Sequence, residues 1–333
     1  MHNILFIGTF FSKRTGTKSI AEKIQNSFSG KYKIKLVSSI KNKPLRLLHI
    51  LITCVFFRGK TINIDVFSDN AFLIVSYASK ILAKRNKKII LTLRGGKLPD
   101  FYKLKPENFK KVLQRATVTQ TPSRYLQTFF KKQNIEVTYL PNPIHLQNFA
   151  YAPKPKPLHL LWVRAFTSIY NPEIPVKLVH QLKKEFPTIQ LSMIGPNKGL
   201  QSKIEALIKE LNLEKNITIL GPIPNQELPQ YYQNHTVFLN TTSYESFGTA
   251  VMEAAACGIP IVSTAVGEIP FLWTDKKNIL LTKNITAEAF VEPVTQLLKS
   301  KKLCADIHKN AQEIVNTFDW HKIIKQWNNI LTS

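Results

Sequence analysis

Residues 240–270, NTTSYESFGTAVMEAAACGIPIVSTAVGEIP, constrain the fold of this chain more than any other stretch. A short apolar run ends at Asn240, and the turn SYESFG follows it. The next segment, TAVMEAAA, has the spacing of a helix, and Gly258 and Pro260 directly after it are typical of a helix end. A β-branched run over 259–264 predicts a second strand. The stretch therefore predicts a β–turn–α–β unit.

The turn and the start of this helix form a candidate anion site. Unpaired backbone N–H groups and the positive end of the helix dipole face an anion bound at a glycine-containing helix start. Glu245 comes just before the helix and Glu253 lies inside it. A carboxylate beside an anion site must serve another group, so we expect these two acids to contact ribose or sugar hydroxyls.

The rest of the chain repeats the alternation of strand and helix. It begins with a strand over 3–8, a loop containing Gly16 and an amphipathic helix over 17–28, which resembles the start of a Rossmann-like half. The GxGxxG fingerprint is absent, so Gly16 marks either a nucleotide-binding loop or a plain βα turn. The alternation predicts parallel sheets with helices on both faces.

A run rich in proline and lysine, APKPKPLH at 152–159, divides the chain. It has no periodicity and indicates a linker. A length of 333 residues exceeds one ordinary core and suits two domains of about 150 residues. We therefore predict an α/β protein with two Rossmann-like domains, 1–153 and 154–317. We expect a final helix at about 318–333 to pack back on the first domain.

Cysteine usage and the N-terminus indicate a cytoplasmic protein. Cys54, Cys257 and Cys304 share no metal-ligand spacing and lie in apolar contexts, which is typical of buried thiols in a reducing compartment. The N-terminus is apolar but lacks the basic region of a signal peptide, and it continues directly into Gly8. We interpret it as a first strand.

The net charge of +25 is distributed unevenly. Residues 1–155 contain 28 lysines and arginines against 6 acidic residues, whereas residues 156–333 contain 18 against 15. This asymmetry favours an anionic partner for the first domain: a membrane leaflet, a lipid-diphosphate acceptor or nucleic acid. A coding bias towards lysine is the alternative explanation.

The most apolar segment of the first half, within residues 41–60, is bracketed by basic residues. Lys41, Lys43, Arg46, Arg58 and Lys60 flank a stretch that is too short to span a bilayer. The pattern fits a core helix with basic ends. It also fits an interfacial helix that dips into an anionic leaflet.

Several motifs of the second half resemble those of one enzyme family. Glu245-Ser246-Phe247-Gly248, Glu253-Ala254 and Gly258-Ile259-Pro260 resemble an E-x7-E motif and its continuation, with Gly267 following. Gly221-Pro222-Ile223, with Leu228 and Tyr231-Tyr232, matches the preceding loop. Leu140-Pro141-Asn142-Pro143 resembles the segment that ends the first domain. These motifs resemble the retaining GT-B glycosyltransferases of family 4, the glycosyl transferases group 1. The resemblance is strong over 215–270, and the element order fits the whole chain.

The resemblance implies a GT-B fold, in which two Rossmann-like domains face each other across a cleft. It implies transfer of a sugar from a UDP- or GDP-linked donor to a hydroxyl acceptor, with retention of the anomeric configuration. It implies no metal and no cofactor beyond the nucleotide-sugar co-substrate. With the basic first half, it favours a glycan or lipid-linked acceptor in envelope polysaccharide synthesis. The protein would then be cytoplasmic and peripheral on the inner face of the membrane.

The resemblance also implies roles for individual residues. Glu253 would accept hydrogen bonds from ribose hydroxyls, Glu245 would contact the donor sugar near the reacting carbon, and Ile223 would border the base. The backbone N–H groups of Phe247, Gly248, Thr249 and Ala250 at the helix start would bind the diphosphate, and Ser246 would also belong to the donor-binding residues. Gly16 would contribute to donor binding from the first domain.

The chain departs from the family where phosphate is bound. The family usually places Arg and Lys in R-x4-K spacing after the first strand of the second domain. Arg164 occupies the first place, but apolar Ile169 occupies the second. Arginine can bind phosphate in a bidentate manner, yet one positive charge is missing. Tyr170 or Asn171 is a candidate for a hydrogen bond, and Lys198 for the charge.

Other departures affect the first domain and the region after the motif. Arg94, followed by two glycines, stands where many relatives have a histidine. We expect Arg94 to face the cleft and contact the donor or acceptor, although a surface arginine at a strand end fits equally well. Glu268 stands where a second glycine is common, and Phe271 where an acid is common.

Two other functions remain open from the sequence. A nucleic-acid-binding Rossmann protein would explain the basic half, but the chain lacks interleaved basic and aromatic motifs. That function also leaves Glu245 and Glu253 unexplained, so we expect no nucleic-acid partner. An inactive sugar-binding partner of another transferase is the second alternative.

Overall fold

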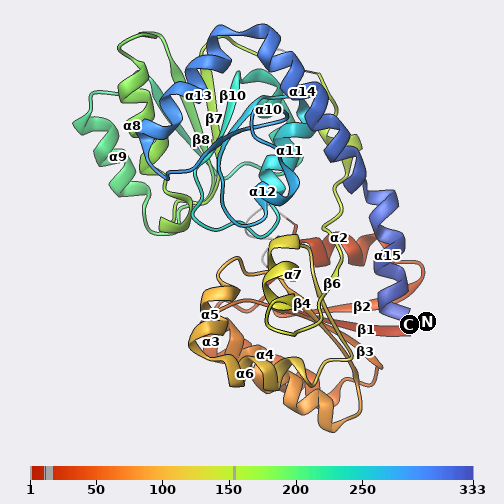
Figure 1. The fold of residues 1–333 in the computed structure, drawn as a ribbon. Helices are drawn as coiled ribbons and strands as arrows, with labels where there is room; N and C mark the ends of the chain where they lie inside the picture. The colour runs from red at the N-terminus through yellow and green to blue at the C-terminus, as the bar shows by residue number, and fades with distance from the viewer. Residues whose placement is uncertain (1, 11, 13–17, 153–154, 333) are drawn as a thin grey trace. The chain divides into compact units, whose positions relative to one another are not determined.

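The computed structural model describes residues 2–10, 12, 18–152 and 155–332, and it divides into two compact units. The first unit comprises 1–143 and 321–333, and the second comprises 144–320. Each unit contains one six-stranded parallel sheet with helices on both faces (Figure 1). The predicted α/β class with two Rossmann-like domains is therefore confirmed. Gly16 lies outside the described residues.

The sheet of the first unit has the order β2-β1-β3-β4-β5-β6, with all neighbours parallel. Its strands are β1 (His2–Ile7), β2 (Tyr32–Val37), β3 (Thr61–Val66), β4 (Lys88–Leu93), β5 (Val118–Thr121) and β6 (Thr138–Tyr139). Its helices before the second unit are α2 (Ile20–Ser27), α3 (Lys43–Phe56), α4 (Asn70–Lys84), α5 (Leu98–Leu104), α6 (Pro106–Leu113) and α7 (Arg124–Lys131). The main apolar core lies between the sheet and α3, α4, α5, α6 and α7.

The final helix, α15 (Trp320–Thr332), packs on the first unit from His321 onwards. Trp327 is fully buried, and its ring lies 6.5 Å from that of Phe6 in β1. The Tyr32 hydroxyl donates to Asn328 Oδ1 at 2.7 Å, and Lys88 Nζ donates to the carbonyl oxygen of Ile330 at 2.7 Å. The last helix therefore completes the core of the unit that contains the start of the chain.

The sheet of the second unit has the order β12-β11-β10-β7-β8-β9 and is also parallel. Its strands are β7 (His159–Val163), β8 (Gln190–Ile194), β9 (Ile217–Gly221), β10 (Val237–Asn240), β11 (Ile261–Thr264) and β12 (Leu280–Thr282). Its α-helices are α8 (Glu173–Leu182), α9 (Gln201–Glu210), α10 (Leu228–Asn234), α11 (Thr249–Cys257), α12 (Ile269–Leu272), α13 (Ala287–Lys299) and α14 (Lys301–Val315). Helices α8, α9 and α13 cover one face, and α10, α11 and α12 cover the other (Figure 1).

The second unit begins before the predicted linker. The backbone N–H of Ile144 donates to Phe318 at 2.9 Å, and that of Trp320 donates to Ile144 at 2.8 Å. These bonds join the first residue of the unit to its last residues, which follow α14. The cysteines lie inside the units: Cys54 and Cys257 are buried as expected, whereas Cys304 is only half-buried.

We predict that Trp327→Ala lowers the free energy of unfolding of the first unit by about 3–5 kcal/mol, because it leaves a cavity against the sheet. Native-state amide exchange of β1 measures this loss. Lys325→Ala, on the exposed side of the same helix, is the control and should change the free energy by less than about 0.5 kcal/mol. Unchanged exchange in the Trp327 variant would show that α15 does not complete this core.

Candidate active site

The order of the second sheet reverses between β7 and β10, which are neighbours although 73 residues of chain separate the end of one from the start of the other. Ligands of open α/β sheets bind outside the carboxyl ends of the strands at such a reversal. Arg164 directly follows β7, and Asn240 is the last residue of β10. The sheet therefore brings these two residues together at the position where a ligand is expected.

Arg164 is held by hydrogen bonds to Asn240, at the end of β10, and to Glu245, in the turn that follows it. Its Nη2 donates to Asn240 Oδ1 and to Glu245 Oε2, both at 2.8 Å, and its Nε donates to Asn240 Oδ1 at 3.2 Å. Asn240 is itself held, because its Nδ2 donates to Ser263 Oγ at 2.8 Å. The guanidinium carbon lies 5.3 Å from the ring centroid of Tyr170. Nη1 makes no hydrogen bond within the described residues, so it remains available to a ligand.

Glu245 holds the turn before α11. Its Oε1 accepts from the backbone N–H groups of Ser246 at 3.1 Å and Phe247 at 3.3 Å, while Oε2 accepts from Arg164. Gly267 packs directly on this turn: it has φ +56°, and a Cβ there would lie 1.9 Å from the carbonyl oxygen of Glu245. Only glycine fits this position. The Phe247 N–H, predicted to meet a diphosphate, is bound by Glu245 in the structure.

The start of α11 presents backbone N–H groups without a side-chain cap. Gly248 occupies the N-cap in the left-handed region, φ +84°, and has no side chain that could bond to the first turn. Thr249 and Ala250 are the first residues of the helix, so their N–H groups lack carbonyl partners within it. Together with the helix dipole, these groups favour an anion at this point.

Glu253 lies one helical turn further along α11 and is buried among polar groups of α10 and the loop before it. Its Oε1 accepts from Asn225 Nδ2 at 3.1 Å, and its Oε2 accepts from the Tyr232 hydroxyl at 3.4 Å. Burial, followed by the Glu253 carboxylate, raises the pKa of Tyr232 well above its ordinary value, so the phenol stays a donor. Ile223, in the same loop as Asn225, packs against the core beneath α11.

The segment around Ile169 is fixed by its backbone. The carbonyl oxygen of Ile169 accepts from the N–H of Ser243 at 2.7 Å, and Asn171 Nδ2 donates to the carbonyl oxygen of Thr241 at 2.7 Å. Asn171 thus holds the loop after β10, whereas the aromatic ring of Tyr170 lies beside Arg164. Lys198 is exposed in the loop after β8. Of the three proposed substitutes for the missing lysine, only Tyr170 contacts Arg164.

Arg94 is not a surface arginine. It follows β4 at the carboxyl edge of the first sheet, and its side chain is only 11% exposed. Nε donates to Asp65 Oδ1 at 2.6 Å and Nη1 to Asn142 Oδ1 at 2.8 Å. Nη2 is buried and lacks a hydrogen-bond partner within the described residues. This buried, oriented cation at a strand end is compatible with a binding role and excludes the simple surface interpretation.

The structure gives site contacts to three residues for which the sequence predicted no contact. Asn240, Asn225 and Tyr232 each contact a predicted site residue, although Asn240 and Tyr232 were noted only as parts of the 240–270 stretch and of the matched loop. Their roles depend on which strands and loops are neighbours. Among the described residues, no group of three or more His, Cys, Asp and Glu side chains is arranged to hold a metal ion.

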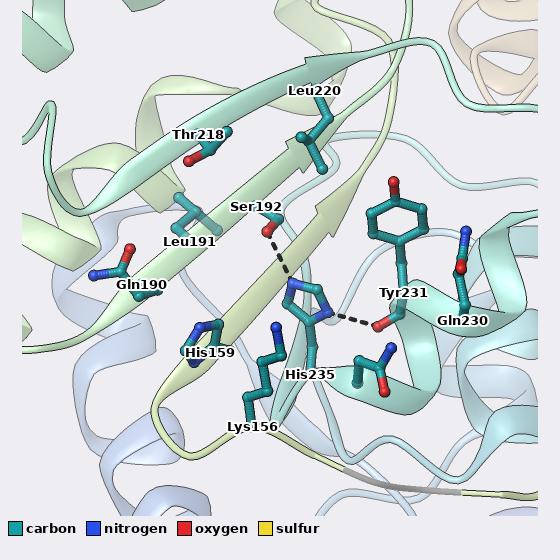
Figure 2. A pocket seen from close by; sticks show the side chains of 11 residues that line it. Lys156, His159, Gln190, Leu191, Ser192, Thr218, Leu220, Gln230, Tyr231 and His235 are labelled. Atoms are coloured by element: carbon teal, nitrogen blue, oxygen red, sulfur yellow. Dashed lines mark hydrogen bonds between the residues drawn. The ribbon is translucent and has the colours of Figure 1, made fainter.

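A pocket of about 390 Å³ lies towards the opposite, amino ends of the strands in the second unit. Figure 2 shows His235 pointing from the end of α10 towards Ser192 in β8. Its Nδ1 donates to the carbonyl oxygen of Tyr231 at 2.6 Å, and its Nε2 lies 2.8 Å from Ser192 Oγ. Because this pocket is at the wrong end of the sheet for the reversal, we do not assign it to the donor.

The family profile described as "Glycosyl transferases group 1" matches residues 145–314, which is most of the second unit. The D-inositol 3-phosphate glycosyltransferase of Corynebacterium aurimucosum is 28% identical over 182 residues, covering 52% of this chain and 43% of that protein. The D-inositol 3-phosphate glycosyltransferase of Mycobacteroides abscessus is 26% identical over 162 residues, covering 47% and 36%. The matched part thus spans less than half the length of these curated relatives.

Solved structures match the fold over the whole chain. Sucrose-phosphate synthase from Thermosynechococcus elongatus superposes with a TM-score of 0.81 at 17% identity, covering 99% of this chain and 98% of that one. Anabaena HepE in complex with UDP-glucose has a TM-score of 0.80 at 17% identity and full coverage of both chains. These similarities confirm the predicted GT-B class.

We predict that the second unit loses stability in mild acid through His235. Burial lowers the pKa of His235 from 6.5 to about 4, against the opposing effect of its bond to Tyr231. Between these pH values the unfolded chain binds a proton that the folded chain does not, so stability is full above pH 6.5 and falls as pH drops towards 4. The free energy of unfolding of the second unit should be about 2 kcal/mol lower at pH 5 than at pH 7.5.

Urea unfolding at the two pH values measures this loss, with His235→Gln as the matched variant. The variant should be less stable at pH 7.5 but should lose about 2 kcal/mol less than wild type between pH 7.5 and pH 5. An equal loss in both proteins would show that His235 is not the titrating group.

Proposed function

We propose, because this chain belongs to the family of glycosyl transferases group 1, that it transfers a sugar from a nucleotide-linked donor to a hydroxyl acceptor. The observation that carries the proposal is the cluster at the reversal of the second sheet. There Arg164, Glu245 and the uncapped start of α11 lie together, and Glu253 lies one turn away. This set combines a cation, an anion-binding helix start and a carboxylate suited to hydroxyl groups.

We assign the nucleotide along α11. The diphosphate would bind at the first turn, near Thr249 and Ala250, and the ribose hydroxyls would donate to Glu253. Asn225 and Tyr232 would keep the Glu253 carboxylate oriented, and Ile223 would border the base. HepE, which shares the fold, was solved with UDP-glucose. This supports UDP-linked sugars as the first donors to test, and GDP-linked sugars as the second.

In the proposed reaction, the bond between the anomeric carbon and the phosphate oxygen breaks, and its electron pair leaves with the nucleoside diphosphate. The acceptor oxygen bonds to the anomeric carbon with retention, and the acceptor proton passes to the departing phosphate or to solvent. Arg164 Nη1 and the helix start would stabilise the negative charge on the leaving group. Because these groups supply positive charge at the phosphates, the proposal includes no metal ion.

Glu245 and Arg94 are the remaining proposed site residues, one in each unit. Glu245 would contact the donor sugar near the reacting carbon, and its bonds to Arg164 and the turn would hold it there. Arg94 would contact the donor or acceptor, and Asp65 and Asn142 would hold its guanidinium through Nε and Nη1. With Ile169 in place of lysine, Tyr170 would orient Arg164 through its ring but would add no charge.

We further propose a glycan or lipid-linked acceptor in bacterial envelope polysaccharide synthesis. The strongly basic first unit supports an acceptor or surface of negative charge. It also supports a cytoplasmic protein that is peripheral on the inner face of the membrane.

We predict different kinetic effects for two substitutions. Glu253→Ala removes charge-assisted hydrogen bonds to ribose and should weaken donor binding by about 10- to 100-fold. Arg164→Ala removes stabilisation of the leaving diphosphate and should lower turnover by about a hundredfold or more, with a smaller change in donor affinity. Release of UDP or GDP from the corresponding nucleotide sugars, with titration of the donor, separates the two effects.

Glu227→Ala, an exposed change in the loop before α10, is the control and should leave both constants unchanged. Normal donor affinity and turnover in both site variants would contradict the assignment. Donor binding by wild type without any turnover, with lipid extracts as the acceptor source, would favour the inactive-partner alternative.

A further inference from the structure

Helices α3 and α4 of the first unit carry an exposed apolar face that we call the α3–α4 face. On α3 it consists of residues 45–75% exposed: Leu45, Leu48, Ile52, Val55 and Phe56. On α4 it includes Leu73 and Tyr77, both more than half exposed. The spacing on each helix places these residues on one side. The two helices pack side by side (Figure 1), and each carries its own exposed apolar row.

The exposed apolar row of α3 does not belong to the side of the helix that packs on the core. The opposite side of the helix is occupied by Ile50, Thr53 and Cys54, which are buried against the sheet. Exposed apolar rows on two neighbouring helices are uncommon in a protein without a partner, and they mark an interaction site. The interfacial interpretation of residues 41–60 therefore fits the structure better than a helix that is wholly core.

The charges on and around this face are positive, apart from Asp69 at the start of α4. The sequence contains no acidic residue between Glu22 and Asp65, or between Asp69 and Asp100. Exposed lysines and an arginine lie at the ends of α3 and along α4: Lys41, Lys43, Arg58, Lys80 and Lys84. A protein partner would have to match both the apolar row and this one-sided charge, whereas an anionic leaflet offers acyl chains and negative headgroups together.

The α3–α4 face is held rigid by hydrogen bonds. Arg85, at the end of α4, donates through Nη1 to the carbonyl oxygens of Cys54 at 2.7 Å and Phe57 at 2.9 Å. At the other end of α3, Arg46 donates through Nε to Ile40 at 2.8 Å. The face is thus preformed, so docking does not have to order these two helices.

We propose that the α3–α4 face docks on the surface of an anionic lipid bilayer. The apolar row would enter the region between headgroups and acyl chains, and the surrounding lysines would bind the headgroups. None of the helices that the structure describes is long and apolar enough to cross a membrane, so the contact would be peripheral. This inference rests on the proposed function in one respect: it names the surface that would make the membrane contact proposed there.

The test measures co-sedimentation with vesicles of phosphatidylcholine and of phosphatidylcholine with phosphatidylglycerol. Wild type should bind the anionic vesicles and not the neutral ones, with binding that weakens as salt is raised. The double variant Leu48→Gln/Ile52→Gln should bind at least about tenfold more weakly, since two apolar side chains no longer enter the interface. Lys43→Gln/Lys80→Gln should weaken binding to anionic vesicles and reduce its salt dependence.

The control is Leu220→Gln/Phe271→Gln, which changes exposed apolar residues of the second unit and should bind like wild type. Circular dichroism checks that each variant is folded. Wild type that stays in the supernatant, or face variants that bind like wild type, would overturn the proposal. Concentration-dependent dimerisation that only the face variants lose would also overturn it and would assign the face to a second copy.

Release of UDP or GDP from nucleotide sugars, measured without vesicles and with lipid extracts as the acceptor source, separates this inference from the proposed function. The face variants should release the nucleotide at the wild-type rate, because the face contains no proposed site residue. Loss of vesicle binding with normal release supports both proposals. Absence of release in wild type would contradict the proposed function while leaving the vesicle result as the test of docking.

Discussion

The buried ion pair between Arg164 and Glu245 is the interaction on which the candidate site depends. The two side chains are 2.8 Å apart and only 11% and 12% exposed. A buried pair needs hydrogen bonds beyond the pair itself to offset the cost of taking both charges out of water. Here Asn240 satisfies two further donor contacts of Arg164, and the N–H groups of the turn satisfy Glu245. The pair therefore ties the end of β7 to the start of α11. The same bonds leave Arg164 Nη1 and the first turn of α11 available to an anion.

The local parts of this site could be predicted from the sequence, because their signals are local. Helical spacing, the glycines at both ends and the β-branched run placed α11 and its flanking strands within two residues. The pairing of Arg164 with Glu245 could not be predicted from spacing, since 81 residues separate them and their contact requires β7 to lie beside β10. The contacts of Asn225 and Tyr232 with Glu253 could not be predicted either, because they also depend on which elements are neighbours. Helix α12 and strand β12 were missed because four and three residues are too few to show periodicity.

The first unit shows a different limit of sequence patterns. Segment 41–60 is apolar on nearly every side, so its composition could not distinguish the buried side of α3 from the exposed one. Packing against the sheet determines which side is buried: Ile50 and Cys54 are buried, whereas Leu48 and Ile52 are exposed. Arg94 is similar: only the fold shows that Asp65, on the neighbouring strand, buries it in an ion pair. In both cases the residue type indicated a possible role, but only the tertiary structure shows which groups each side chain contacts.

The central claim is that the start of α11 and Arg164 bind the diphosphate of a nucleotide sugar. The most direct test is a crystal structure of the chain with whichever of UDP and GDP raises its melting temperature. We predict phosphate oxygens within hydrogen-bonding distance of the Arg164 guanidinium and of the N–H groups of Thr249 and Ala250, with the ribose hydroxyls on Glu253. A nucleotide bound elsewhere, or the failure of both nucleotides to bind, would contradict the claim.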